Sequence, residues 1–326
     1  MSRVFAARVV AFTALAAAIV AGMLVPQLAA AATPASPTLR LSIPDAFLVS
    51  HHLATVPGRV VQIKGSVSPY VPGQAVVVQA SVAGKQFKTE TLRINSAPGG
   101  SDGRFTETLK SPRAGDVTVA VSHAATPTLG AFSGTRRFAA LDEHVGFGSR
   151  GPFVELIQQR LAALHFYIPQ TGVFDTGTGL ALDAYHRLLH WGTYQTLDSR
   201  TISFLLDGYG AFPVHFPSHG NHAEGDLSLQ LLALISGSHV LAIYPISSGK
   251  PSTPTIVGNF HVYSKVPGYL PDGMYFSNFF ISGYAIHGYD PAPDYPASHG
   301  CMRLPIVDAL SVYDWLQIGD WVDTYY

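Results

Sequence analysis

The sequence predicts a mainly β, multidomain protein. It should comprise an antiparallel β-sandwich, a small three-helix bundle and a mostly-β C-terminal domain with one docked helix. Three observations predict this fold class. Apolar residues alternate with polar ones in short runs up to about residue 140, repeat at helical spacing from about 145 to 208, and form β-type runs again from about 214. A chain of 326 residues can hold two or three domains.

The first region, residues 37–140, contains several short strand patterns with turn signals at Gly84 and Asp102-Gly103. Two alternating runs place small apolar side chains on one face: Val76, Val78, Ala80 and Val82, and then Val117, Val119 and Val121. Short strands at this spacing predict a sandwich of immunoglobulin-like shape, although no cysteine pair supports true immunoglobulin kinship. We expect this domain to be a spacer or an interaction module.

Residues 145–208 change to helical periodicity. Pro152 suits the first position of a helix, and Val154, Ile157 and Leu161 then form one apolar stripe. A second helix is expected after Gly177, and Asp198 can cap a third, short helix. This pattern predicts a small bundle.

Residues 214–326 return to strand patterns. We expect a hairpin of residues 227–235 and 240–246, two strands within 274–286, and a closing strand at 321–325. The one convincing helix follows Pro305 and is expected to end at Gly319.

The N-terminus, residues 1–32, has the pattern of a secretory signal peptide. Arg3 and Arg8 precede an uncharged apolar run at 9–25, and small residues follow at 29–32. An uncleaved anchor is the alternative, because the run lies at the lower end of the roughly 17–25 residues that span a membrane. In both cases the remainder of the chain is expected outside the cytoplasm.

Composition and charge exclude some classes of partner. The formal net charge is −1, and charged residues make up 13% of the chain, against about 25% in an ordinary soluble domain. A nucleic-acid partner would call for a basic face, so none is expected. Cys301 is the only cysteine, which excludes an intramolecular disulfide. A free cysteine is most often a small buried hydrophobe, and its neighbours must decide whether it has a chemical role.

The segment 284–304, "YAIHGYDPAPDYPASHGCMRL", concentrates reactive groups: His287, Ser298, His299, Cys301 and Arg303. His287 follows an apolar run and should end a strand. Prolines at positions 291, 293 and 296 lower the entropy cost of holding the intervening loop in one shape. The loop is therefore expected to return Cys301 close to His287.

These residue types are suited to acyl transfer. An imidazole within hydrogen-bond reach lets a thiolate form, an imidazolium stabilises it, and the same ring can protonate a leaving amine. Gly300 allows a close backbone approach to a substrate. The N–H groups of Gly300 and Cys301 are candidate donors of an oxyanion site.

Other interpretations of these residues remain open. A cysteine near two histidines is compatible with a metal site, but zinc sites use three or four ligands at recognisable spacings, so no metal and no cofactor are expected. Arg303 alone suits a structural ion pair, and Ser298 suits a turn.

Two further histidine groups occur outside this segment. His215, His219 and His222 are compatible with a metal site, but a histidine-bearing surface strand and loop accounts for them as well. His51-His52 have no partners that would indicate catalysis.

The motif "HG…SHGCMRL" closely resembles the His-Gly…Ser-His-Gly-Cys-x-Arg signature of L,D-transpeptidases of the YkuD type. The stretch "DLSLQLLALISGSHVLAIYPISSGKPSTPTIVGNFHVYS" resembles the opening of that domain, and the resemblance covers about residues 214–326. It implies an L,D-transpeptidase catalytic domain. One departure is Ile306, where many members carry asparagine, and this leaves local substrate contacts open.

The resemblance also implies roles for individual residues. Cys301 would be the nucleophile and His287 the base, with the Gly288 carbonyl orienting its ring. His299 would shape the oxyanion site, and Arg303 would organise the pocket or hold a substrate carboxylate.

A second resemblance covers residues 148–186. Their hydrophobic spacing and the Gly-Val-Phe-Asp turn at 172–175 are similar to the peptidoglycan-binding-like module of wall enzymes. A helical spacer with no affinity for a ligand is the alternative.

The implied reaction joins two peptidoglycan stem peptides in a 3→3 cross-link, whereas transfer to water would make the enzyme an L,D-carboxypeptidase. Papain-like and NlpC/P60 hydrolases are disfavoured, because they place the cysteine before the histidine. A non-enzymatic wall-binding protein is a further alternative. The expected partners are stem peptides and glycan, with membrane contact only through an uncleaved anchor. We expect an exported, wall-associated monomer.

Overall fold

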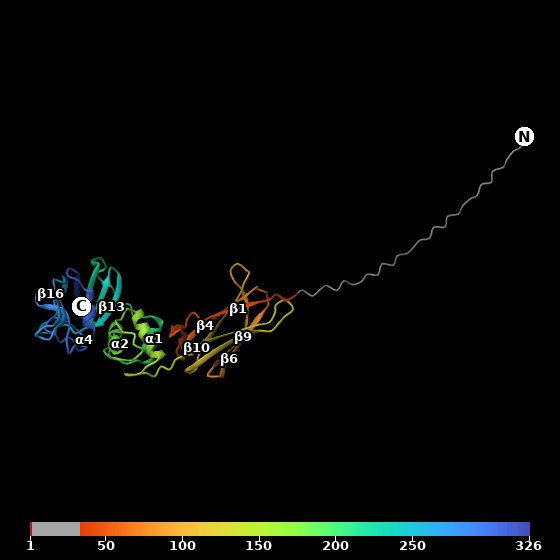
Figure 1. Cartoon of the computed structure of the whole chain (residues 1–326), viewed down its shortest axis with the longest axis horizontal. Helices are drawn as coiled ribbons and strands as arrows, with labels where there is room; N and C mark the ends of the chain where they lie inside the picture. The colour runs from red at the N-terminus through yellow and green to blue at the C-terminus, as the bar shows by residue number, and fades with distance from the viewer. Residues whose placement is uncertain (2–32) are drawn as a thin grey trace.

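The computed structural model describes Met1 and residues 33–326. The predicted signal peptide, residues 1–32, therefore lies outside the described residues except for Met1. Figure 1 shows a β-sandwich, a group of helices and a second β-rich region arranged in a row along the long axis of the molecule. Within the described part of the chain, no helix is long and apolar enough to cross a membrane.

The predicted sandwich is confirmed. One sheet has the order β1 (Thr38–Ser42), β4 (Val60–Ser68), β8 (Gly103–Lys110), β7 (Asn95–Ser96). The other has the order β2 (Phe47–Val49), β3 (His52–Thr55), β10 (Phe132–Ala140), β9 (Gly115–His123), β5 (Ala75–Val82), β6 (Lys85–Arg93). The alternating valines and alanines predicted to share one face in β5 and β9 are all buried between the sheets.

The middle region consists of α1 (Pro152–Ala163), α2 (Thr176–Leu188) and α3 (Ser199–Asp207). Pro152 occupies the start of α1, and the Asp198 side chain accepts the Thr201 N–H at the start of α3, as predicted. Asp175 caps α2 in the same way, a role that the sequence reading overlooked. Buried Gln158 donates to the Val173 carbonyl (2.9 Å) and accepts the Gly172 N–H (2.8 Å), which holds the turn before α2.

The three helices share one continuous core with both neighbouring regions. This core includes Val49 and Ala54 of the sandwich, Leu156 and Leu182 of the helices, and Leu231 of the C-terminal region. A β-bridge between Phe166 and Ile243 reinforces the second junction. The helical region is therefore packed against the C-terminal region and is more than a tether.

The C-terminal region is built from two sheets. The five-stranded sheet has the order β13 (His239–Pro245), β12 (Leu231–Ser236), β11 (Asn221–Asp226), β19 (Trp321–Tyr325), β14 (Gly258–His261). The four-stranded sheet has the order β15 (Ser264–Tyr269), β16 (Tyr275–Ile281), β17 (Tyr284–Gly288), β18 (Met302–Leu304). The expected hairpin is formed by β12 and β13.

The docked helix α4 (Ile306–Trp315) follows Pro305, as predicted, and a short 3-10 turn, η1 (Pro217–His219), precedes β11. The expected end of α4 at Gly319 is wrong, because Leu316 already has an extended backbone (ψ 136°). Val312 and Leu316 are fully buried in the core between the sheets.

Candidate active site

Two neighbouring parallel strands bring the reactive residues together. In the register of β17 and β18, His287 lies opposite Arg303, and Cys301 immediately precedes β18. Side chains alternate along a strand, so Cys301 and Arg303 share a face with His287. The intervening residues Ile286 and Met302 face the core and are fully buried. The long loop 289–301 is what makes this parallel pairing possible.

This face borders a cavity of about 460 Å³. Its lining includes five of the predicted site residues: His287, Ser298, His299, Cys301 and Arg303. Gly288 ends β17 beside it, and Gly300 precedes the nucleophile candidate. The sequence reading missed other residues of the lining, including Asp272, Met274, Tyr284 and Tyr289. They come from the β15–β16 hairpin tip and from β17 and its exit, and no local motif marked them.

His287 is held by a single hydrogen bond. Its Nδ1 lies 2.9 Å from the Gly288 carbonyl, which can only accept, so Nδ1 carries the proton and Nε2 carries the lone pair. The side chain is only 2% exposed. Burial lowers the pKa of His287 to about 4. The ring is therefore neutral near neutral pH and is available as a base.

Burial also acts on the half-buried Cys301. It raises the pKa of the thiol above its usual range, although the Ala285 N–H and the Arg303 charge act in the opposite direction. Both members of the pair are thus neutral at rest. Burial thus works against the imidazolium–thiolate pair that the sequence led us to expect.

The turn before Cys301 is held tightly. Ser298 Oγ donates to the Cys301 carbonyl (2.6 Å) and accepts the Gly300 N–H (3.0 Å). The Gly300 N–H is therefore already used, which contradicts its expected place in an oxyanion site and leaves the Cys301 N–H as the candidate donor of the two. In this structure Ser298 shapes the turn.

Gly300 is required sterically in this turn. Its φ is +120°, and a Cβ on Gly300 would lie 1.6 Å from Cε1 of Tyr284. Both the backbone conformation and the packing of the Tyr284 ring exclude a larger residue.

The segment 247–255 braces the same turn. Thr255 Oγ1 donates to the Gly300 carbonyl (2.9 Å) and Thr253 Oγ1 to the Ser298 carbonyl (3.1 Å). Ser247 exchanges two backbone hydrogen bonds with Arg303, each of 2.9 Å. The Ser-Ser-Gly and Thr-Pro stretches of the sequence therefore support the turn.

The remaining two predicted residues are exposed to the cavity in different ways. The guanidinium of Arg303 lies 4.0 Å over the Tyr289 ring and forms no ion pair with any acid among the described residues. The structural ion pair considered for Arg303 is thus not seen. His299 is exposed, and its Nε2 lies 3.1 Å from Lys250 Nζ.

Residues 221–323 match the model of the YkuD family, described as the L,D-transpeptidase catalytic domain.

Residues 221–323 are an L,D-transpeptidase catalytic domain.

Similar solved structures carry the same description. The L,D-transpeptidase of Xylanimonas cellulosilytica is 29% identical with a TM-score of 0.52, and the match covers 57% of this chain and 98% of that one. The catalytic domain of the E. faecium L,D-transpeptidase is 25% identical with a TM-score of 0.30, covering 33% of this chain and 98% of that one. No curated protein matches the chain.

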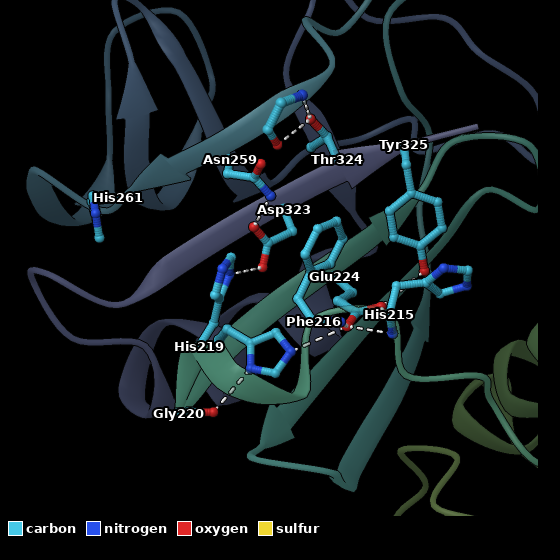
Figure 2. A network of polar contacts seen from close by, with 12 residues as sticks. His215, Phe216, His219, Gly220, Glu224, Asn259, His261, Asp323, Thr324 and Tyr325 are labelled. Carbon is cyan, nitrogen blue, oxygen red and sulfur yellow. Dashed lines mark hydrogen bonds and ion pairs between the residues drawn. The ribbon is translucent and has the colours of Figure 1, made fainter.

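The second histidine cluster lies on β11 and on the segment that precedes it, where it contacts acids of β11 and β19 (Figure 2). His222 is fully buried and lies 3.1 Å from Glu224 through Nε2, so the expected surface strand is wrong for this residue. Glu224 also accepts the N–H groups of His215 and Phe216 and the Tyr325 hydroxyl. These hydrogen bonds hold residues 215 and 216, which precede β11, against that strand.

A second buried acid, Asp323, lies in the same network of polar contacts. Asp323 is fully buried and is contacted by His219 Nδ1 (3.0 Å) and by the Asn259 amide (2.6 Å). Across residues 33–326, no group of three or more His, Cys, Asp or Glu side chains is arranged to hold a metal ion. His51 and His52 are exposed on the sandwich, more than 200 residues before the cleft residues in the sequence.

Proposed function

We propose that this protein is an L,D-transpeptidase that forms 3→3 peptidoglycan cross-links by cysteine acyl transfer through Cys301. One observation supports the proposal: in the β17–β18 register the sole thiol, a neutral imidazole and the Arg303 guanidinium, which pairs with no acid among residues 33–326, lie on one face of a cavity within an L,D-transpeptidase catalytic domain.

In the first half-reaction Cys301 Sγ attacks the carbonyl that joins the diamino acid of a tetrapeptide stem to its terminal D-amino acid. His287 Nε2 takes the thiol proton as the S–C bond forms, and it returns that proton to the amine that leaves. The product is a thioester on Cys301. A base that is neutral at rest suits this step, since a protonated ring could not accept the proton.

In the second half-reaction an amine of a neighbouring stem attacks the thioester. His287 takes the proton of the amine and delivers it to the departing sulfur, which regenerates the neutral pair. If water takes the place of the amine, the same steps release a tripeptide, and the enzyme acts as an L,D-carboxypeptidase.

Arg303 is proposed to bind the terminal carboxylate of the donor stem, because its guanidinium pairs with no acid in the described part of the chain and can donate paired hydrogen bonds to a carboxylate. Such contact would fix which carbonyl lies beside Cys301. His299, at the rim with Lys250, is proposed to shape the oxyanion site.

The remaining parts of the chain fit work on the cell wall. We propose that residues 1–32 direct export, that the helical region binds glycan, that the sandwich is a spacer, and that the protein is a wall-associated monomer. The signal-like N-terminus supports export, and the resemblance of residues 148–186 to a peptidoglycan-binding-like module supports glycan binding.

The proposal is tested by incubating the purified chain with tetrapeptide stems and an acceptor stem and identifying the products by mass spectrometry. We expect a cross-linked dimer and a thioester adduct on Cys301, and neither with Cys301→Ala. Full activity of Cys301→Ala would disprove the mechanism. Tripeptide as the sole product would assign the carboxypeptidase reaction.

A further inference from the structure

A buried arginine links the helical region to the catalytic domain. Arg187 lies near the end of α2 and is only 7% exposed. Its Nη1 donates to two main-chain carbonyls across the junction, those of Gln230 (2.9 Å) and Ile246 (3.0 Å). Asp183, one turn earlier on α2, pairs with Arg187 Nη2 at 2.5 Å. A planar guanidinium held by its own helix can fix the positions of both carbonyls.

Gln230 is the next link. It adopts a left-handed backbone conformation, with φ +56°, which a residue with a side chain rarely adopts without support. Its carbonyl accepts Arg187 Nη1 and the Ile246 N–H. Its side chain holds Ser248 at two points, accepting the Ser248 N–H (2.8 Å) and donating to Ser248 Oγ (2.7 Å).

Ser248 connects Gln230 to the turn of residues 298–301, which carries the thiol and is called the nucleophile turn below. The Ser248 carbonyl accepts the N–H groups of both Ala297 (2.9 Å) and Ser298 (3.0 Å). Ser298 Oγ then bonds the Cys301 carbonyl and the Gly300 N–H. A continuous series of buried hydrogen bonds therefore runs from α2 to Cys301, through residues that are each at most 7% exposed up to Ser298.

We propose that Arg187 and Gln230 are positioning residues for Cys301, so that the helical region is a working part of the catalytic apparatus as well as a candidate glycan-binding module. The series sets the orientation of the turn that carries the thiol and its N–H donor. Catalysis is sensitive to such placement, because a displacement of about 1 Å at a reacting group can lower a rate by about 100-fold. The activity readout of this inference depends on the proposed transpeptidase function.

A double-mutant cycle on the full chain tests the series. Arg187→Met, Gln230→Met and the double variant are compared by kcat and KM for cross-linking, per mole of folded enzyme. We expect each single change to lower kcat by about 10-fold with KM within about 3-fold of the parent. The kcat of the double variant should equal that of the less active single variant, because both changes interrupt the same series of hydrogen bonds.

Arg160→Met is the matched control. Arg160 also donates from a helix to a main-chain carbonyl, that of Leu205 (3.4 Å), but this contact stays within the helical region. It should leave kcat unchanged, even if it lowers thermal stability, and should combine additively with Gln230→Met. Independent, additive effects of Arg187→Met and Gln230→Met would overturn the proposal, as would an unchanged kcat in Arg187→Met.

Two additions keep the test decisive. If Arg187→Met fails to fold because it leaves Asp183 buried without its partner, the paired change Asp183→Leu/Arg187→Met removes both charges and takes its place. The pH profile of Cys301 alkylation by iodoacetamide needs no substrate, so it can be measured even if the parent shows no cross-linking. We expect the profile to change in the Arg187 variant and to stay the same in Arg160→Met; an unaltered profile in both would contradict the series.

Discussion

Two buried histidines of the catalytic domain have pKa values that shift in opposite directions. His287, in the cleft, has the Gly288 carbonyl as its one hydrogen-bond partner among the described residues, and burial lowers its pKa to about 4. His222, in β11 of the five-stranded sheet, is equally buried, and burial again opposes its charge. There, however, hydrogen bonds to Glu224 and the Gly220 carbonyl outweigh burial, and the pKa of His222 is raised.

The carboxylate of Glu224 explains why the pKa of His222 is raised while that of His287 is lowered. Burial also works against the charge of Glu224, but His222, two backbone N–H groups and the Tyr325 hydroxyl all donate to it, so its pKa is lowered. A buried acid that accepts a hydrogen bond from a histidine favours the charged form of the ring, and such a contact can anchor a chain segment. A buried histidine without such an acid remains a neutral base, which suits proton transfer.

The largest expected effect is on the cleft side. His287→Gln removes the base while keeping a polar side chain that can reach the Gly288 carbonyl, so we expect kcat for cross-linking to fall by about 1,000-fold. The rate is measured with stem peptides, and the melting temperature serves as the folding control. A fall of less than about 10-fold would mean that another group takes the thiol proton.

The next largest effect concerns the hydrogen-bond network around Glu224 and is an effect on stability. Glu224→Leu removes the acceptor of four donors and leaves His222 buried without its acid, so we expect unfolding free energy to fall by about 3–5 kcal/mol. Urea unfolding measures this loss, and kcat per folded molecule should change by less than about 2-fold. Glu90→Gln, on the exposed surface of β6, is the control and should change neither quantity. A large loss of kcat in Glu224→Leu would show that the hydrogen-bond network around Glu224 is coupled to the cleft.

The smallest effect is in the pH dependence of stability, where the two histidines should act with opposite sign. The folded pKa of His287 lies below its unfolded value of about 6.5, so its contribution is present above about pH 6.5 and is lost as pH falls towards 4, by on the order of 3 kcal/mol at most. The folded pKa of His222 is raised, so its contribution is present below about pH 6.5 and is lost as pH rises through the folded value.

Urea midpoints measured across this range for His287→Gln and His222→Gln test the signs. His287→Gln should flatten the curve between about pH 4 and 6.5, and His222→Gln should flatten it above about pH 6.5. Equal slopes in the two variants would contradict the opposite directions of the two pKa shifts.

Much of the architecture could be predicted from residue patterns. The alternating valines of β5 and β9 indicated a sandwich because only one face of each strand is buried. The stripe of α1 and the cap at Asp198 indicated helices for equally local reasons. The strand before His287 and the stiff loop after it indicated that Cys301 would return to its side, and the β17–β18 pairing has that form.

The sequence by itself thus determined the order of strands and helices, the single thiol and the segment in which the cleft residues lie, because these depend on local periodicity and loop length. Only the tertiary structure decided the direction of each histidine's pKa shift, the use of the Gly300 N–H by Ser298, and the link from Arg187 to the nucleophile turn. Burial and hydrogen-bond partners come from residues far apart along the chain, and no local pattern records them.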